Sequence, residues 1–191
     1  MRVIGGEARG TKISSSRKGK VRPTPAMVRE ALFNILGSIE GTSWADLYAG
    51  TGSVGLEALS RGASRVVFVE KNAQLIKQIA RSVREMGFQE RAAVMEGDIK
   101  AVVKRLSRMG VMFHVVFADP PYDSDLVGKT VELCTKAPIL SDGGLLVIQH
   151  SRREDVHYPL FEPSWEVVDV RHYGDTNLTI IQYRKRSEDE K

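Results

Sequence analysis

Residues 44–59, WADLYAGTGSVGLEAL, join a short apolar run to a helical pattern through a glycine-rich loop. Gly50, Gly52 and Gly55 occupy the three glycine positions of a G-x-G-x-x-G pattern. Glycine lets the chain turn sharply and lets its backbone approach a ligand closely, and this pattern typically follows a strand and opens a helix. The stretch therefore predicts a strand, a ligand-binding turn and a helix, in that order.

Apolar runs and helical patterns continue to alternate along the chain. This alternation predicts a parallel sheet with helices on both faces, because parallel neighbours need helical crossovers. The end differs, since two strand-like runs are joined only by the turn-rich residues 171–177, which favours an antiparallel hairpin. We expect an α/β, Rossmann-like fold with a seven-stranded, mostly parallel sheet and a C-terminal antiparallel hairpin. The expected strands are 44–48, 66–69, 93–95, 111–118, 145–148, 165–170 and 178–183, and the expected helices run from Thr24-Pro25 to Gly37 and over 54–59, 75–86, 99–108 and 126–136.

The composition is that of a soluble globular domain, with 42% hydrophobic and 27% charged residues. No apolar run approaches the roughly 20 residues that a membrane span needs. The start of the chain lacks the apolar core of a signal peptide, and the lone Cys134 cannot form an internal disulfide. We expect a cytoplasmic protein, a monomer, without membrane association.

Positive charge is concentrated at the start of the chain. Residues 1–29 hold eight of the 28 Lys and Arg residues against the single acid Glu7, so this segment carries +7 and the rest carries −3. Such asymmetry indicates an arm that contacts a polyanion such as RNA, although a solvated terminus without a partner is the alternative. We expect residues 1–24 to form a basic arm, 25–184 the folded domain, and 185–191 a charged, frayed tail.

Acidic residues mark the ends of four predicted parallel strands: Asp46, Glu70, Asp98 and Asp119. Ligands of open α/β sheets bind outside the carboxyl ends of the strands, so we expect these acids near one crevice. Glu70 stands twenty residues after Gly50, where an acid can accept both hydroxyls of a ribose. This spacing fits a dinucleotide or S-adenosylmethionine. The absence of a second region for substrate, and the acid at Asp98 that can accept an adenine amine, favour S-adenosylmethionine.

Residues 115–123, VVFADPPYD, end an apolar run at a carboxylate, two prolines and an aromatic. Consecutive prolines fix φ twice and restrict the residues before them, so this corner is stiff. The Asp119 carboxylate and the Pro120 carbonyl could each accept one hydrogen of an exocyclic amine and aim its lone pair at a methyl donor. Tyr122 would offer a face on which an extruded base stacks. An ordinary strand-ending turn is the alternative.

These motifs together resemble the RsmD family of bacterial methyltransferases, in the Rossmann-like class I group that uses S-adenosylmethionine. The resemblance rests on the glycine loop, DPPY at 119–122, RVIGGEARG at 2–10, RPT at 22–24 before VREALFNIL, and YGDT at 173–176, and it covers about residues 2–183. It implies methylation of the N2 amine of a guanine in 16S ribosomal RNA. The expected partner is this RNA within a small-subunit particle. Many relatives carry an acid where Gln149 stands, so no carboxylate role is assigned there.

The resemblance also assigns roles to individual residues. Gly50 and Gly52 would line the methionine part of the cofactor, Glu70 the ribose, and Asp98 with Ile99 the adenine. The full set of candidates comprises the catalytic residues Asp119, Pro120, Pro121 and Tyr122; the cofactor-binding residues Asp46, Gly50, Thr51, Gly52, Glu70, Lys71, Asp98, Ile99 and Asp119; and the substrate-binding residues Arg9, Lys12, Arg17, Lys18, Lys20, Arg22, Thr24, Tyr122 and Tyr173.

Several alternatives stay open from the residues alone. Within the class, the target could be adenine N6 in DNA or RNA, or a protein glutamine; outside it, a nicotinamide-dependent oxidoreductase or a non-catalytic RNA-binding module. Thr24 could only cap a helix, and residues 173–176 could form only a turn. No histidine pair has metal-ligand spacing, so we expect no metal and read His114, His150, His157 and His172 as structural.

Overall fold

The computed structural model describes residues 1–14, 24–121, 125–154 and 164–185. The chain forms two compact units, Met1–Ile99 and Lys100–Lys191. The first contains α1 (Ala26–Leu36), β1 (Ser43–Leu47), α2 (Ser53–Ser60), β2 (Arg65–Glu70), α3 (Ala73–Glu85), a 3₁₀ turn (Gln89–Arg91) and β3 (Ala92–Glu96). α4 (Ile99–Arg108) begins at the last residue of that unit, and the second unit continues with β4 (Phe113–Ala118), α5 (Leu126–Lys136), β5 (Leu140–Ser151), β6 (Trp165–Tyr173) and β7 (Thr176–Tyr183).

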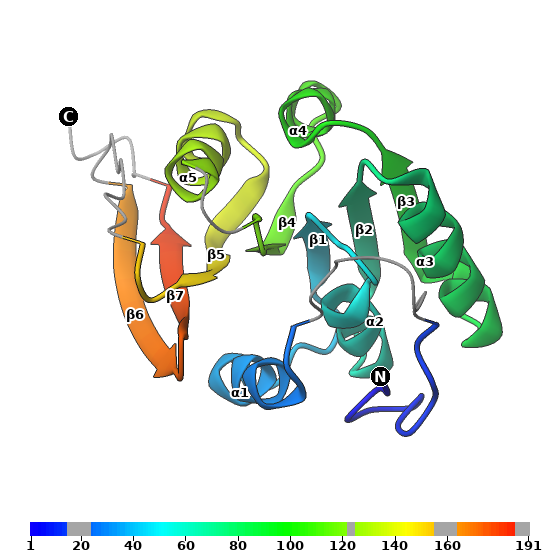
Figure 1. The fold of residues 1–191 in the computed structure, drawn as a ribbon. Coiled ribbons are helices and arrows are strands. Elements are labelled where there is room, and N and C mark those ends of the chain that lie inside the picture. The colour runs from blue at the N-terminus through cyan, green and yellow to red at the C-terminus, as the bar shows by residue number, and fades with distance from the viewer. Residues whose placement is uncertain (15–23, 122–124, 155–163, 186–191) are drawn as a thin grey trace. The chain divides into compact units, whose positions relative to one another are not determined.

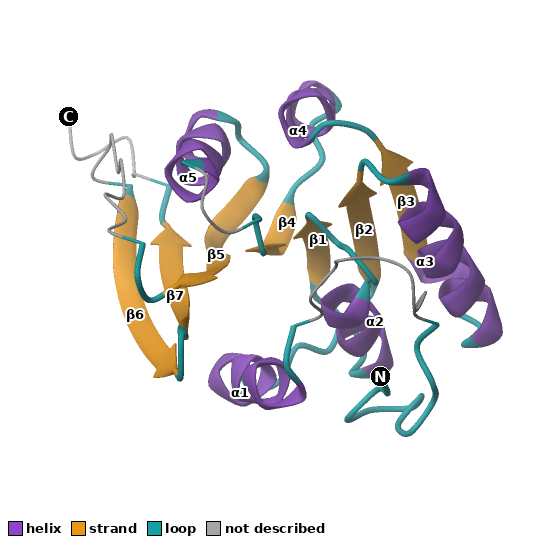
Figure 2. Ribbon diagram, in the orientation of Figure 1, coloured by secondary structure: helices purple, strands orange, loops and turns teal. Residues whose placement is uncertain are grey.

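The strands form a seven-stranded mixed sheet in the order β3-β2-β1-β4-β5-β7-β6, which confirms the predicted fold class (Figure 1). In the first unit β2 pairs in parallel with both β1 and β3. In the second unit β4 and β5 are parallel, whereas β7 is antiparallel to both β5 and β6. The C-terminal hairpin is therefore also as predicted, and Figure 2 shows it beside β5.

Burial explains why the first unit folds as it does. β1 and β2 are buried along almost their whole length, as expected for central parallel strands covered on both faces. α3 instead has one apolar face, and its Leu75, Ile79 and Val83 are buried. It begins at Asn72, whose side chain accepts hydrogen bonds from the backbone N–H groups of Gln74 and Leu75.

β5 and the two strands of the final hairpin extend furthest beyond their predicted bounds. β5 begins at Leu140, five residues before the predicted start, and its pairing with β4 shifts register between Phe113 and Val115. The final hairpin has a turn of only two residues, because Tyr173 and Thr176 still pair. Gly174, the first turn residue, has φ 61°, as in a type II′ turn. Because Gly174 permits this tight turn, β6 and β7 continue into residues 171–177, which the sequence predicted to be a longer turn-rich link.

The first thirteen residues pack against α2. Val3 and Ile13 are buried, and Arg2 pairs with Lys12 in an antiparallel bridge. The buried Glu57 carboxylate accepts hydrogen bonds from the backbone N–H groups of Ile4 (2.8 Å) and Gly5 (2.7 Å). This part of the predicted arm is thus held by a folded helix.

Two cations, the buried Arg29 and the half-buried Arg61, complete that anchor. Glu57 also forms ion pairs with Arg61 at 2.8 Å and with Arg29 at 3.5 Å. Arg29 donates to the backbone carbonyl of Arg2 and is 1% exposed, so its charge belongs to the interior and not to an RNA-facing surface. Burial lowers the pKa of Arg29, and Glu57 opposes that effect. In the described part of the chain no helix is both long and apolar enough to span a bilayer.

Candidate active site

The glycine loop has the backbone geometry that its sequence predicts. Gly50 and Gly52 have φ values of 56° and 74°, in the left-handed region that favours glycine. Tyr48, two residues before Gly50, has φ 59° and is the one non-glycine residue with positive φ among those described. A bulky residue in this region is strained, and such strain concentrates at functional sites. Nothing in the sequence around Tyr48 signalled this conformation.

Glu70 connects the glycine loop to the end of β2. Its Oε2 accepts a hydrogen bond from the Gly50 N–H at 2.9 Å, and its Oε1 accepts from the N–H groups of Lys71 and Asn72, each at 2.9 Å. Within the described residues these bonds use three of the roughly four acceptor positions of a carboxylate. Glu70 therefore shapes the loop. Its carboxylate has about one acceptor position left, enough for one ribose hydroxyl, whereas the sequence suggested that it accepts from two. Its contact with a cofactor stays a prediction.

Asp46 organises the other end of the loop. Its Oδ2 accepts a hydrogen bond from the Gly55 N–H at 2.9 Å, within the first turn of α2, and the side chain is buried. A carboxylate at this position is stabilised by the helix dipole. Gly55 also has a packing role, because a Cβ placed there would lie 2.3 Å from Cε1 of Phe68 on β2. The third glycine thus permits close contact between helix and strand.

The remaining cofactor candidates in the first unit lie around the same strand ends. Thr51 is buried in the loop, and Lys71 follows Glu70 with an exposed side chain. Asp98 is exposed in the two-residue link between β3 and α4, and Ile99 is buried at the start of α4. The Gly97 N–H donates to the Glu70 carbonyl at 3.1 Å, which ties this link to the end of β2. The predicted clustering around Glu70 is therefore present in this unit, while adenine binding stays a prediction.

Asp119 directly follows β4 in the second unit. Ala118 pairs with Ile148 in the parallel β4–β5 ladder, so the next residues of each strand, Asp119 and Gln149, are neighbours. The Gln149 Nε2 donates to Asp119 Oδ2 at 3.1 Å. Pro120 is buried and Pro121 is exposed, whereas Tyr122 lies outside the described residues. The contact of Gln149 with Asp119 was not predicted from the sequence, because it depends on the register of β4 against β5.

The C-terminal hairpin turn lies at the same end of β5 as Gln149. Ser151, the last residue of β5, pairs with Thr176, and the Arg152 N–H donates to the Asp175 carbonyl at 2.8 Å. Tyr173 is half-buried at this turn. A role for Tyr173 in substrate binding stays a prediction.

The buried His150 has structural partners. Its Nε2 lies 3.0 Å from Thr179 Oγ1 and its Nδ1 lies 3.0 Å from the Ser151 carbonyl oxygen. Burial lowers the pKa of His150, while the bond to Ser151 and the charge of Glu154 act in the opposite direction. Across the described ranges, no group of three His, Cys, Asp or Glu side chains is arranged to hold a metal ion. His150 therefore behaves as a neutral core residue.

The predicted RNA-binding residues are only partly described. Arg9 and Lys12 are exposed on the packed N-terminal segment. Thr24 is buried just before α1, whose N-cap residue is Pro25. A capping role and a substrate-binding role for Thr24 both stay predictions. Arg17, Lys18, Lys20 and Arg22 lie outside the described residues.

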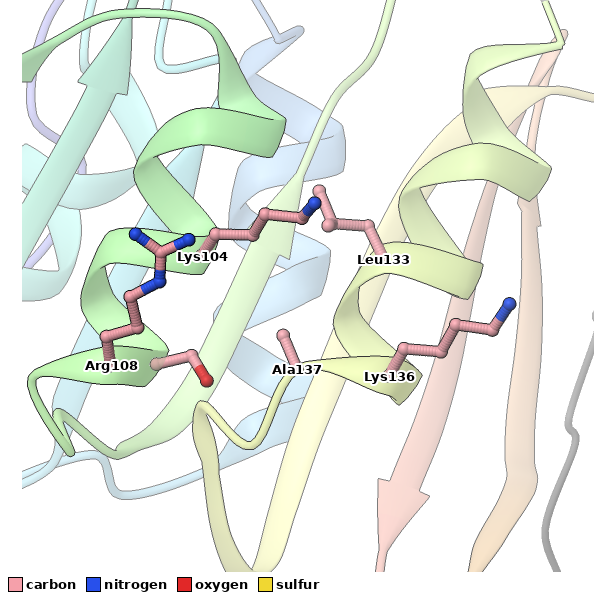
Figure 3. Close-up of a pocket in the computed structure, with 6 residues that line it drawn as sticks. Lys104, Arg108, Leu133, Lys136 and Ala137 are labelled. Atoms are coloured by element: carbon pink, nitrogen blue, oxygen red, sulfur yellow. The ribbon is translucent and has the colours of Figure 1, made fainter.

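A separate hollow of about 260 Å³ lies between α4 and α5 (Figure 3). Figure 3 shows Lys104 reaching from α4 toward Leu133 on α5, with Arg108 and Lys136 nearby. Arg108 and Lys136 lie in the last turns of their helices, where cations are stabilised by the helix dipole. These helix ends lead into β4 and β5, so the hollow lies at the opposite ends of those strands from Asp119. It is not part of the candidate active site.

The strand order, with its antiparallel final strands, defines the class I methyltransferase fold. The chain belongs to the family described as conserved hypothetical protein 95, whose model matches residues 1–182. YlbH of Bacillus subtilis, a candidate rRNA methyltransferase, is 30% identical over 97% of this chain and 100% of its own. Ribosomal RNA small subunit methyltransferase D of Escherichia coli K12 is 28% identical over 98% of this chain and 92% of its own.

Solved structures agree with this assignment. A candidate methyltransferase of Escherichia coli, yhhF, superposes with a TM-score of 0.82 at 28% identity, over 97% of this chain and 99% of the other. An RNA methyltransferase from Salinibacter ruber, in complex with S-adenosyl-L-homocysteine, superposes with a TM-score of 0.65 at 17% identity, over 88% of this chain and 97% of the other. The latter likeness supports the fold alone.

Proposed function

We propose that this protein transfers a methyl group from S-adenosylmethionine to the exocyclic N2 amine of a guanine in small-subunit ribosomal RNA. The observation that carries the proposal is Asp119, held by Gln149 at the rigid end of β4 in a chain of the methyltransferase fold. Family membership and the small-subunit rRNA methyltransferase D of Escherichia coli support RNA as the substrate.

The first unit has the residues that such a cofactor needs. S-adenosylmethionine supplies a methyl group on a positively charged sulfur. Gly50 and Gly52 permit close approach to its methionine part, and Glu70 has acceptor capacity left for one ribose hydroxyl. Asp98 is exposed and can accept a hydrogen bond from the adenine amine. Asp46 and Glu70 hold the loop in this form through their bonds to Gly55 and Gly50.

The second unit would orient the amine. The lone pair of a nucleobase amine is delocalised into the ring, which makes it a poor nucleophile. The Asp119 carboxylate and Pro120 carbonyl would accept its two hydrogens and direct the lone pair toward the methyl carbon. Orientation of this kind can lower a barrier by up to roughly 7–11 kcal/mol. Methyl transfer would form the N–C bond as the donor's C–S bond breaks, and the methylated nitrogen would then release one proton to water.

The N-terminal residues would hold the RNA backbone. Arg9 and Lys12 are exposed cations, and phosphate contacts of this kind fix the register without reading sequence. With Arg17, Lys18, Lys20, Arg22 and Thr24 they would form an RNA-binding region over residues 1–24, while Tyr122 would stack on the target base and Tyr173 would contact RNA at the hairpin turn. We propose a small-subunit particle as the substrate, in keeping with the small-subunit rRNA methyltransferase D of Escherichia coli.

The decisive experiment is to map the methyl group. The protein is incubated with labelled S-adenosylmethionine and, separately, naked 16S RNA, small-subunit particles and duplex DNA, and the labelled nucleoside is identified by mass spectrometry. We expect N2-methylguanosine at one position of the RNA. Label in N6-methyladenosine or in protein would contradict the proposed target. Binding of NAD with no binding of S-adenosylmethionine would contradict the class of reaction.

A further inference from the structure

We propose that Gln149 is the residue that selects guanine over adenine as the target base. Gln149 is 2% exposed, its Nε2 donates to Asp119, and its Oε1 has no hydrogen-bond partner among the described residues. A buried polar atom without a partner is rare in folded proteins and calls for a reason. This inference rests on the proposed function, since it concerns the base that Asp119 orients.

Asp119 determines which way the Gln149 amide faces. An ionised carboxylate can only accept hydrogen bonds, so it must face the amide NH₂ and not the amide oxygen. The Oε1 of Gln149 is bonded to the same carbon as Nε2 and is therefore an acceptor fixed close to the Asp119 carboxylate. The pair thus presents two acceptors side by side, one charged and one neutral.

Guanine and adenine differ in what stands beside the reactive amine. In guanine the ring nitrogen N1 next to the N2 amine carries a hydrogen and is a donor. In adenine the N1 next to the N6 amine carries a lone pair and is an acceptor. A guanine whose amine is held by Asp119 could donate N1–H to Gln149 Oε1, whereas an adenine in the same position would place two acceptors against each other. Such mismatches of buried polar groups are the strongest source of discrimination available to a site.

A role in packing or in positioning Asp119 explains only part of this arrangement. Packing alone would be met by an apolar side chain, which leaves no buried atom without a partner. Positioning Asp119 requires the Nε2 donor but not the Oε1 acceptor. Because Oε1 has no exposure to solvent, neighbouring side chains must shift when the base enters, and the gain of a hydrogen bond would favour that shift.

The test changes the base and the residue together. Small-subunit particles are reconstituted with RNA in which a synthetic segment carries either guanine or 2,6-diaminopurine at the mapped target position. Diaminopurine keeps the 2-amine but has an unprotonated N1. Single-turnover rates at saturating S-adenosylmethionine give a guanine preference for wild type, Gln149→Leu, Gln149→Glu and the control Gln182→Leu. Gln182 lies on β7, where its Nε2 donates to the Gly143 carbonyl at 3.3 Å and its Oε1 accepts from Arg184 Nε at 3.0 Å.

We expect wild type and Gln182→Leu to prefer guanine by about tenfold or more, the effect of one good hydrogen bond in a buried site. Gln149→Leu should reduce the preference to about twofold or less. Gln149→Glu keeps an acceptor for N1–H but loses the donor to Asp119, so it should keep the preference while its rate falls. Any effect of diaminopurine on particle assembly is common to all variants and cancels in their comparison.

Three results would separate the possible failures. If wild type methylates guanine but Gln149→Leu retains the full preference, Gln149 does not read the base and this inference is wrong while the proposed function stands. If Gln149→Leu does not fold, the Gln149→Glu variant tests the inference instead. Loss of the guanine preference in Gln149→Glu would overturn the inference. If wild type methylates no guanine in any particle, the proposed function itself fails.

Discussion

The Glu70 carboxylate accepts a hydrogen bond from the Gly50 N–H at 2.9 Å, across twenty positions of the chain. The same carboxylate accepts from the N–H groups of Lys71 and Asn72. Through these bonds the end of β2 holds the loop that follows β1, so the residue predicted to bind a ribose also builds the site. Loss of Glu70 should therefore affect both cofactor affinity and stability.

Glu70→Ala is expected to weaken S-adenosylhomocysteine binding by roughly 1.5–3 kcal/mol, the value of a hydrogen bond to an ionised group. It should also lower the free energy of unfolding, because three backbone donors lose their acceptor. Titration calorimetry and urea unfolding measure the two effects. Glu96→Ala is the matched control, since Glu96 pairs with Glu70 in the β2–β3 ladder but is exposed. Unchanged affinity in Glu70→Ala would exclude Glu70 from the cofactor site.

Gly55→Ala tests the packing of the glycine loop. The added Cβ would lie 2.3 Å from Phe68 Cε1 and 2.9 Å from Val66 Cγ1, so we expect a loss of about 1–3 kcal/mol in the free energy of unfolding. Phe68→Leu should create room, so the double variant should lose less than the sum of the two single variants. Urea unfolding of all four proteins measures this coupling. Additive losses would show that the clash does not limit stability.

The elements of the fold followed from the sequence because each depends on local pattern. α4 and α5 have the bounds that their periodicity predicted, and Gly37 ends α1 as expected. The glycine loop was also predictable, since positive φ at Gly50 and Gly52 is a local requirement of the turn.

Contacts between distant segments could not be predicted in the same way. The N-terminal residues were predicted to form a basic arm because their charge is visible in the sequence, whereas Glu57, which accepts hydrogen bonds from Ile4 and Gly5, looks like an ordinary helical acid in the sequence. Similarly, the contact between Gln149 and Asp119 depends on the register of β4 against β5, and that register shifts near the start of β4. A shift of this kind leaves no mark in composition or periodicity.

Charge substitutions in the N-terminal segment test RNA contact without unfolding its anchor. Arg9→Gln with Lys12→Gln removes two exposed cations, whereas deletion of residues 2–20 would also strip the buried Glu57 of the Ile4 and Gly5 donors. Each lost phosphate contact should reduce the slope of log affinity against log salt by roughly 0.7–0.9. Filter binding of 16S RNA between low and high salt measures the slope. The control Lys77→Gln with Arg84→Gln changes exposed cations on α3, and an equal effect of both pairs would mean that the N-terminal segment has no special role.

His150 should make stability depend on pH. Burial lowers its pKa in the folded state below the ordinary value of 6.5. As pH falls below 6.5 the unfolded chain binds a proton that the folded chain does not, so the free energy of unfolding falls, by at most about 1.4 kcal/mol per pH unit for one group. His150→Gln should weaken this slope between pH 7 and 5. Parallel urea-unfolding profiles for wild type and His150→Gln would exclude this role.

Asp119→Ala tests the orientation of the target amine. Asp119 follows β4, is held by Gln149, and precedes two prolines that fix the backbone, so its carboxylate is positioned before the base arrives. Its attraction for the amine hydrogens increases as the nitrogen rehybridises. Removing one such preorganised group should lower the single-turnover methylation rate by about a hundredfold or more. The control Asp142→Ala removes an exposed acid at the start of β5, whose Oδ1 accepts from the Lys185 N–H, and should leave the rate unchanged.

The step that Asp119→Ala impairs, cofactor binding or methyl transfer, identifies the role of Asp119. Cofactor affinity should change little, because Glu70 and Asp98 are assigned to the cofactor and Asp119 to the base. Tyr122→Ala should instead raise the apparent KM for RNA through lost stacking, worth roughly 1–3 kcal/mol, while Tyr122→Phe keeps the ring and should be mild. Single-turnover rates at saturating cofactor separate these effects. A near-normal rate for Asp119→Ala, or a loss confined to cofactor binding, would mean that the end of β4 does not orient the amine.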